Sequence, residues 1–347
     1  MSPSKPAEPT EASPRPLVSI VMPVRNEEAY IERSLGSVLA QTYPLERMEI
    51  WIADGGSTDK TRELATALGK GAPVFLIDNP RGIVSTGLNA MLEKYQGDIL
   101  LRVDGHCEIA PDYVERCVHY LQTRQIAGVG GPIETVGEDF LSQSIAVAMS
   151  SRFGVGDSTF RTGGSEPTLA DTIAFPAYHR SVLEQAGPFD EELVRNQDDE
   201  FNYRLRKAGH SLLLAPDLSS RYYSRASLRS LWSQYRQYGF WKVRVLQKHP
   251  RQMRWRQFVP PVFVLALLLS LALALTPTPL RPAGRWLAAG VGGSYLVANG
   301  VASVWTAQKA GWRYLGVLPA AFALLHLGYG SGFLVGLVRF ARRWKKP

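Results

Sequence analysis

Four groups of polar side chains in the first third of the chain follow short apolar runs. They are Asn26-Glu27, Asp54, Asp78-Asn79 and Asp104-Gly105-His106. Carboxylate oxygens are the ligands that Mg²⁺ and Mn²⁺ prefer, and these ions commonly bridge to substrate phosphates. A later acidic group, Asp198-Asp199-Glu200, comes shortly before Arg204. The acidic groups that follow the apolar runs indicate a site for Mn²⁺ or Mg²⁺.

The apolar runs before these groups predict strands over residues 17–24, 48–56, 73–79 and 98–106, with helical spacing between them. Alternating strands and helices favour an α/β fold with an open, mainly parallel sheet. Ligands of such sheets bind beyond the carboxyl ends of the strands. We therefore expect the polar groups to converge on one edge. The chain has no GxxxxGK[ST] loop and no GxGxxG after a strand, so the usual kinase and dinucleotide sites are unsupported.

The charges divide the chain into two parts. All 31 acidic residues lie in residues 1–217, whereas residues 218–347 hold 19 Lys and Arg and no acid. The overall charge of +8 therefore averages an acidic domain and a basic, apolar tail. We expect no nucleic-acid partner.

Three uncharged blocks in the tail, residues 258–275, 286–305 and 314–338, are about long enough to cross a bilayer core of roughly 30 Å. The preceding segment alternates basic and aromatic residues, which is typical of the lipid headgroup layer. The positive-inside rule places this side in the cytoplasm. Three crossings would put the basic C-terminal segment on the opposite side, so the sequence leaves the number of spans open.

We divide the chain into a disordered leader (1–16), a catalytic domain (17–225), an interfacial segment (226–257) and a membrane domain of about three transmembrane helices (258–347). The leader is rich in proline and small polar residues and has no export signal. The two cysteines imply no disulfide framework. These features predict a multi-pass protein of the inner cell membrane with a cytoplasmic catalytic domain.

The order of motifs resembles that of family-two glycosyltransferases, which have the GT-A fold. The matching segments are VSIVMPVRNEEAYIERSLGSVLAQTYP, ADGGSTDKT, LNAMLEKYQGDILLRVDGH and QDDEFNYRLRKAGH. DGHCEI, NQDDEFNYRLRKAG and YGFWKVRVLQKHP look most like the succinoglycan-type, ExoA-like exopolysaccharide branch. The resemblance covers residues 17 to 258 and extends over several independent motifs.

The resemblance implies roles for individual residues, which group as follows. Pro23, Asn26, Glu27, Asp54 and Asp104 would bind the nucleotide, Asp104 and His106 would bind the metal, and Asp198 would be the catalytic base, with adjacent Asp199 as the alternative. Gly55 replaces a second acid that the family usually has, and His106 replaces the second acid of its DxD element. His106 would ligate Mn²⁺ better than Mg²⁺, or hydrogen-bond a phosphate directly.

The resemblance implies an inverting hexosyltransferase that moves a sugar, with glucose as one candidate, from a UDP-sugar to a polyprenyl-diphosphate-linked glycan. The lipid anchor of this acceptor would explain the membrane helices. Two alternatives remain from the residues alone. A sugar nucleotidyltransferase would use the same acidic edge but release pyrophosphate, and a non-catalytic membrane scaffold would bind nucleotide weakly or not at all.

Overall fold

The computed structural model describes residues 15–344 except 157–158, 163 and 225–226, so the predicted leader lies almost entirely outside the described residues. Its main sheet has eight strands in the order β3-β2-β1-β4-β9-β6-β10-β8. The bounds are β1 Val18–Val24, β2 Met48–Asp54, β3 Val74–Asp78, β4 Ile99–Arg102, β6 Gly128–Gly131, β8 Thr168–Leu169, β9 Ala174–His179 and β10 Leu212–Leu214. Strands β3, β2, β1 and β4 are parallel, and antiparallel β9 joins β4 to β6. The mixed, mainly parallel α/β sheet confirms the predicted fold class.

Helices cover both faces of this sheet because successive side chains of a strand point to opposite faces. Ile20 and Met22 of β1 pack with one group of buried residues, which includes those of α1 and α4, and Val21 packs with another, which includes those of α3 and α9. The helices of the domain are α1 Ile31–Leu39, α2 Thr61–Leu68, α3 Val84–Leu92, α4 Tyr113–Thr123, α5 Phe140–Met149, α6 Arg152–Val155, α7 Thr159–Thr162, α8 Arg180–Ala186 and α9 Gln197–Lys207. The two faces together form the core that fixes the strand ends.

A small sheet adjoins the point where β4 ends. It consists of β5 (Cys107–Ile109), β11 (Ser220–Tyr223) and β7 (Ile133–Val136). The sequence predicted a strand continuing through His106, but β4 ends at Arg102, and Asp104 to His106 form the turn into β5. The polypeptide changes sheet here because Cys107 to Ile109 pair with β11 instead of β1. Asp104 and His106 are thus placed by a turn between two sheets.

The acidic domain and the basic tail are joined by ion pairs along α10 (Leu228–Lys248). Lys242 pairs with Asp199, and Arg244 Nη2 lies 2.7 Å from Glu192 Oε2. Lys248 pairs with Asp190 and Glu192. These three cations therefore neutralise acids of the preceding α/β part of the chain, while other basic residues of the segment, such as Arg229 and Arg251, are exposed.

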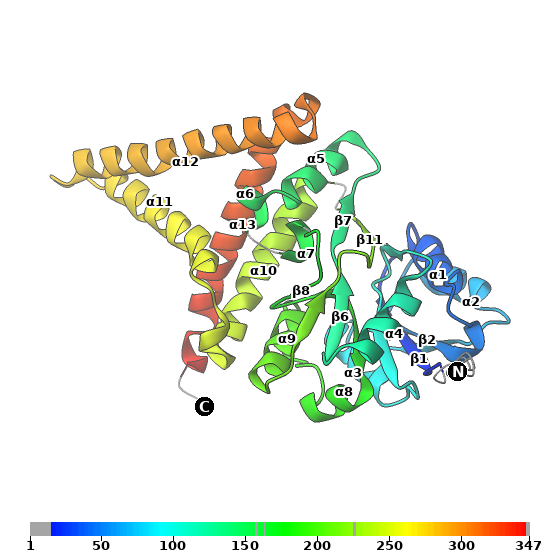
Figure 1. Cartoon of the computed structure of the whole chain (residues 1–347). Coiled ribbons are helices and arrows are strands. Elements are labelled where there is room, and N and C mark those ends of the chain that lie inside the picture. The colour runs from blue at the N-terminus through cyan, green and yellow to red at the C-terminus, as the bar shows by residue number, and fades with distance from the viewer. Residues whose placement is uncertain (1–14, 157–158, 163, 225–226, 345–347) are drawn as a thin grey trace, which may run out of the picture.

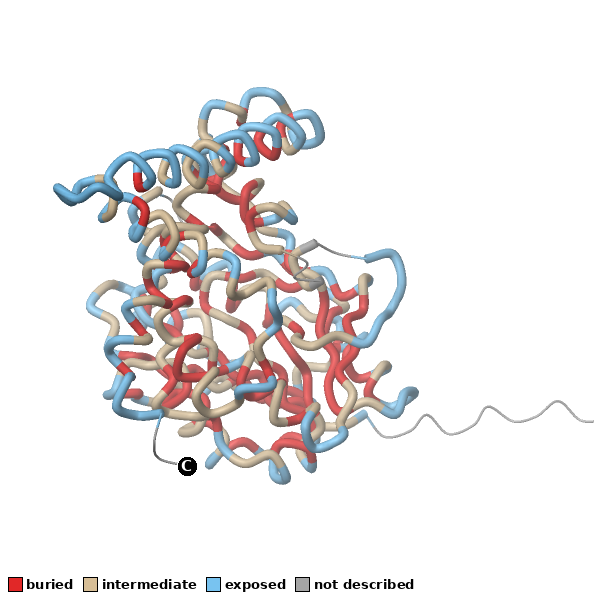
Figure 2. The backbone as a smooth tube through the Cα atoms, turned by 90° about the vertical axis from the view of Figure 1, so that its left-hand side faces the viewer, coloured by how far each residue is buried: buried red, intermediate tan, exposed pale blue. Residues whose placement is uncertain are grey.

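Three helices after α10 are long and apolar enough to cross a membrane. They are α11 (Val259–Leu275), α12 (Arg281–Ala310) and α13 (Leu318–Arg339). In Figure 1, α13 lies beside α10, whereas α11 and α12 form a hairpin whose turn projects away from the catalytic domain. Figure 2 shows that much of this hairpin is exposed, in contrast to the red interior of the domain.

Candidate active site

One cavity of about 880 Å³ extends from the carboxyl ends of the strands to the apolar C-terminal helices. Its volume is within the usual range for small-ligand sites. Strand ends and the first turn of α9 supply Pro23, Glu27, Asn79, Asp104, His106, Asp198 and Asp199 to its lining. The other end is lined by Phe153 and Val155 of α6, Val259 of α11, and Leu325, His326 and Tyr329 of α13. The structure thus brings six of the eight predicted site residues to one cavity, namely Pro23, Glu27, Asp104, His106, Asp198 and Asp199.

The other two predicted residues, Asn26 and Asp54, are not among the described residues that line the cavity. Asp54 is buried, and its Oδ1 accepts hydrogen bonds from the backbone N–H (3.0 Å) and hydroxyl (2.6 Å) of Ser57. Asn26 has a left-handed backbone, with φ of 54°, and its side-chain oxygen accepts from the backbone N–H of Thr58. Both side chains hold the turns next to the cavity together, and a direct nucleotide contact stays a prediction.

The imidazole of His106 is fixed by two neighbours. Its Nδ1 lies 2.8 Å from Glu27 Oε1, and its ring packs edge-on against Tyr222 with centroids 5.0 Å apart. When a neutral imidazole donates from one ring nitrogen to a carboxylate, its other nitrogen has a lone pair, which is the arrangement common around metal-binding histidines. Glu27, predicted to contact the nucleotide, thus lies behind His106 and orients it.

Arg102 contacts Asp104 and lies near Asp198, the two acids that the predicted chemistry needs. Its guanidinium donates to both carboxylate oxygens of Asp104, at 2.8 and 3.2 Å. Burial opposes the charge on Arg102, but the nearby carboxylates of Asp104 and Asp198 more than offset it and raise the pKa of Arg102. The carboxylates of Asp104 and Asp198 are therefore both close enough to Arg102 to stabilise its charge. Arg102 was not among the predicted site residues, although it lies only two residues before Asp104.

The three acids in the first turn of α9 have different partners. Glu200 is buried and binds Arg204 (2.8 Å) and His249 (2.9 Å). Asp199 forms an ion pair with Lys242, whose side chain is only 4% exposed. Asp198 is exposed to the cavity, and among the described contacts its carboxylate accepts only from the backbone N–H of Asp199, at 2.9 Å. Asp198 is the acid of this turn that remains available to a substrate.

The cavity has an excess of positive charge within an acidic domain. Among the described residues that line it are eight arginines, one lysine and five acids. The arginines are Arg25, Arg102, Arg152, Arg161, Arg195, Arg206, Arg254 and Arg256. These arginines belong to elements that are far apart in the sequence, so no local sequence motif predicts that they line one cavity. Such a lining suits a ligand with several negative charges, such as a diphosphate.

The residues at the Asp104 turn fit a divalent cation that a substrate also coordinates. No group of three or more His, Cys, Asp or Glu that could hold a metal occurs among the described residues. Asp104 and His106 offer an incomplete set of protein ligands, and Mg²⁺ or Mn²⁺ sites are often completed by substrate phosphates and water. The oriented imidazole and the carboxylate of Asp104 are consistent with this shared coordination.

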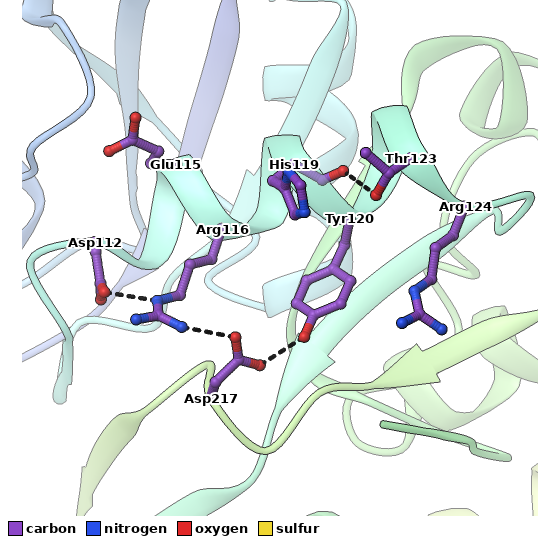
Figure 3. A pocket seen from close by; sticks show the side chains of 8 residues that line it. All are labelled: Asp112, Glu115, Arg116, His119, Tyr120, Thr123, Arg124 and Asp217. Carbon is purple, nitrogen blue, oxygen red and sulfur yellow. Dashed lines mark hydrogen bonds and ion pairs between the residues drawn. The ribbon is translucent and has the colours of Figure 1, made fainter. Parts of the chain in front are cut away.

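A second hollow lies over α4 and is lined by different residues (Figure 3). Arg116 lies between Asp112 and Asp217, at 2.6 and 2.7 Å, and the hydroxyl of Tyr120 donates to Asp217 at 2.9 Å. These groups satisfy one another and tie α4 to the segment between β10 and β11. The cavity that contains Asp104 and Asp198 is therefore the candidate active site.

Comparisons with known proteins agree with this geometry. Residues 19–186 match the family described as Glycosyl transferase family 2. The chain is 32% identical over 327 residues to the succinoglycan biosynthesis protein ExoA of Rhizobium meliloti (strain 1021), covering 93% of this chain and 96% of that protein. It is 28% identical to a dolichyl N-acetyl-alpha-D-glucosaminyl phosphate 3-beta-D-2,3-diacetamido-2,3-dideoxy-beta-D-glucuronosyltransferase of Methanococcus voltae, covering 69% of this chain and 76% of that protein.

The fold is similar to that of a solved mannosyltransferase, PcManGT from Pyrobaculum calidifontis, in complex with GDP-Man and Mn²⁺. The TM-score is 0.55 at 20% identity, covering 92% of this chain and 90% of that one. This likeness confirms the predicted GT-A-type fold. Together with the family match and the relative that aligns over nearly its whole length, it shows that the chain is a glycosyltransferase of family 2.

Proposed function

We propose that this glycosyltransferase moves a sugar from a UDP-sugar to a polyprenyl-diphosphate-linked glycan, with inversion, during exopolysaccharide or cell-envelope synthesis. The observation that carries the proposal is the single cavity that connects the strand-end carboxylates with α11 and α13. A glycan on a lipid anchor has to reach the reaction centre from the bilayer. An opening between polar strand ends and apolar helices suits that amphiphilic acceptor.

The donor half of the cavity suits a nucleoside diphosphate. Asp104 and His106 would hold a Mn²⁺ or Mg²⁺ ion, and when bound the ion would neutralise charge on the departing diphosphate. Arg102 holds Asp104 in place through two hydrogen bonds. Pro23, Asn26, Glu27 and Asp54 form or support the adjacent wall.

Asp198 would take the proton from the acceptor hydroxyl as that oxygen attacks the anomeric carbon. Its carboxylate is open to the cavity, whereas Asp199 is held by Lys242 and Glu200 is buried in a pair. This difference favours Asp198 over Asp199 as the base.

The membrane helices and the basic segment before them support a location in the inner cell membrane, with the catalytic domain in the cytoplasm. A cytoplasmic domain would meet nucleotide sugars directly. The apolar helices would keep the active site at the surface where a lipid-linked acceptor is present.

The test uses the full chain in lipid nanodiscs with Mn²⁺, a panel of UDP- and GDP-sugars, and lipid extract from the source cells. We expect one UDP-sugar to yield UDP and a heavier lipid-linked glycan, only when extract is present. Asp198→Asn should lower kcat by about 10²- to 10⁴-fold while UDP binding persists. Glu63→Gln is the matched control, since Glu63 is also an acid in the first turn of a helix but is exposed in α2.

Release of pyrophosphate in place of UDP would indicate nucleotidyl transfer. Absence of transfer from every donor, together with full activity of Asp198→Asn in cells, would contradict the proposal.

A further inference from the structure

Both ends of α13 are attached to the catalytic domain. Before it, in the turn Trp312–Gly316, Arg313 donates to Gln143 of α5 at 3.2 Å, and Tyr314 stacks on Phe140 with centroids 6.0 Å apart. After it, Arg343 forms an ion pair with Glu192. The 22 residues of α13 span about 33 Å, which is enough to cross a bilayer core. A helix that crossed would have its ends on opposite sides, and a domain in water on one side does not reach both.

The partner of α13 along its length is also unsuited to hydrocarbon. Gly328, Gly332 and Gly336 of α13 pack against Trp232, Arg236 and Phe240 of α10, so the two helices run parallel with a constant offset in sequence. The five basic residues of α10 are Arg229, Arg236, Lys242, Arg244 and Lys248. Charged residues at the centre of a bilayer are costly and therefore rare. The α10–α13 pair therefore belongs at the membrane surface.

The hairpin of α11 and α12 has the opposite character. Its two helices hold each other through the stacked rings of Phe263 and Tyr295, 4.4 Å apart, and through the close approach of Gly284 to Leu273 and Ala274. Its outer faces expose Leu268, Leu269, Leu287, Leu296, Val297 and Val301. Trp286 and Trp305 bound an uncharged stretch of α12 that is about 30 Å long, and aromatic residues favour both membrane interfaces. These are the features of helices that face lipid.

The basic residues next to the hairpin are distributed unevenly. The turn end has Arg281 and Arg285, whereas the end near the catalytic domain has Arg251, Arg254, Arg256, Lys309, Arg313, Arg339, Arg342 and Arg343. The positive-inside rule therefore places the catalytic domain, the base of the hairpin and the end of α13 on one side.

We propose that only α11 and α12 cross the membrane, as a hairpin, and that α13 lies at the surface with the C-terminal segment on the catalytic side. Two crossings return the chain to the side where it entered. This topology accounts for the basic C-terminal residues, which three crossings would place on the far side. The inference rests on the membrane anchoring in the proposed function and is independent of the sugar transfer.

The test labels single introduced cysteines in the full-length protein with a membrane-impermeant maleimide, in intact spheroplasts and in inverted vesicles. Lys70→Cys reports the catalytic domain, Thr278→Cys the turn of the hairpin, and Trp344→Cys the end of the chain without loss of a basic charge. All three positions are exposed. The native Cys107 and Cys117 are buried, and labelling of the parent protein, which has only these two cysteines, measures the background.

We expect Lys70→Cys and Trp344→Cys to react from the same side and Thr278→Cys to react from the other. Labelling of Trp344→Cys opposite to Lys70→Cys would overturn the proposal, because α13 would then cross. Labelling of all three from one side would also overturn it, because the hairpin would not cross. The number of crossings follows from comparing the three positions with one another. If Lys70→Cys reacted from the outside of the cell, the cytoplasmic location of the catalytic domain would be contradicted, but the number of crossings would not change.

Discussion

Gly332 of α13 lies in close contact with the backbone of α10, and its replacement by alanine tests how tightly the two helices are joined. A Cβ atom at Gly332 would lie 2.0 Å from the backbone oxygen of Arg236. Ordinary contact begins at 3.4 Å, so the difference between 3.4 and 2.0 Å requires a local separation of about 1.4 Å. Neighbouring Gly328 and Gly336 also approach the backbone of α10, so the separation would spread along the interface.

The expected cost follows from two opposing effects. Overpacking of a well-packed interior typically costs about 1–3 kcal/mol. Alanine is better than glycine in a helix by about 0.8–1.0 kcal/mol, which offsets part of this cost. Gly290 of α12 is the matched control, since a Cβ there would have no neighbour within 4 Å. Gly290→Ala should therefore be neutral or slightly stabilising, whereas Gly332→Ala should be destabilising.

The assay is thermal unfolding of the two variants and the parent protein in the same detergent, followed by loss of the monodisperse peak. We expect Tm of Gly332→Ala to fall below that of Gly290→Ala by on the order of 5 °C. Equal Tm values for the two variants would refute the packing of α10 against α13 described above. The packing of α13 against the basic helix α10 would then no longer be evidence that α13 lies at the membrane surface.

Three other predictions concern charge and metal. Arg244 donates to Glu192 and, against the effect of burial, lowers the pKa of Glu192 from 4.5 to about 2. The ionised carboxylate of Glu192 therefore stabilises the fold fully above about pH 4.5, and this stabilisation is lost as the pH falls toward 2. The Tm difference between the parent protein and Glu192→Gln should shrink over that range. A Tm difference that does not change with pH would contradict this prediction. Lys242→Met should lower Tm because it leaves the carboxylate of Asp199 unpaired. The double variant Lys242→Met/Asp199→Asn should recover part of this loss. A Tm of the double variant equal to or below that of Lys242→Met would count against the ion pair. Removal of divalent cations with EDTA should abolish transfer, and His106→Asp should shift the activity ratio from Mn²⁺ toward Mg²⁺; an unchanged ratio would argue that His106 is not a ligand.

The parallel strands and the acidic strand ends were predictable because they depend on short-range patterns. Residues 17–24 form an almost continuously buried run, and β1 occupies Val18–Val24 between two parallel neighbours. The carboxyl ends of parallel strands meet at one edge whatever the details of packing. Asp104 and His106 were therefore expected at this edge, and they line the cavity there.

The sequence predicted the wrong local structure for the DGH turn, because the end of β4 depends on a distant partner. Residues 107–109 pair with β11, more than a hundred residues later, and this pairing draws the chain out of the main sheet after Arg102. The arginines that line the cavity were hidden for a similar reason. Arg102, Arg152 and Arg254 share no motif and meet only through the fold.

The sequence by itself determined the class of fold, the family, the acids available for chemistry and the presence of helices apolar enough for a membrane. These follow from residue types and their spacing over a few turns or strands. Only the tertiary structure distinguished Asp198 from Asp199, through Lys242, and attached both ends of α13 to the catalytic domain. Ion pairs and helix contacts of this kind join residues far apart in the chain, and no local pattern encodes which of several chemically similar groups will meet.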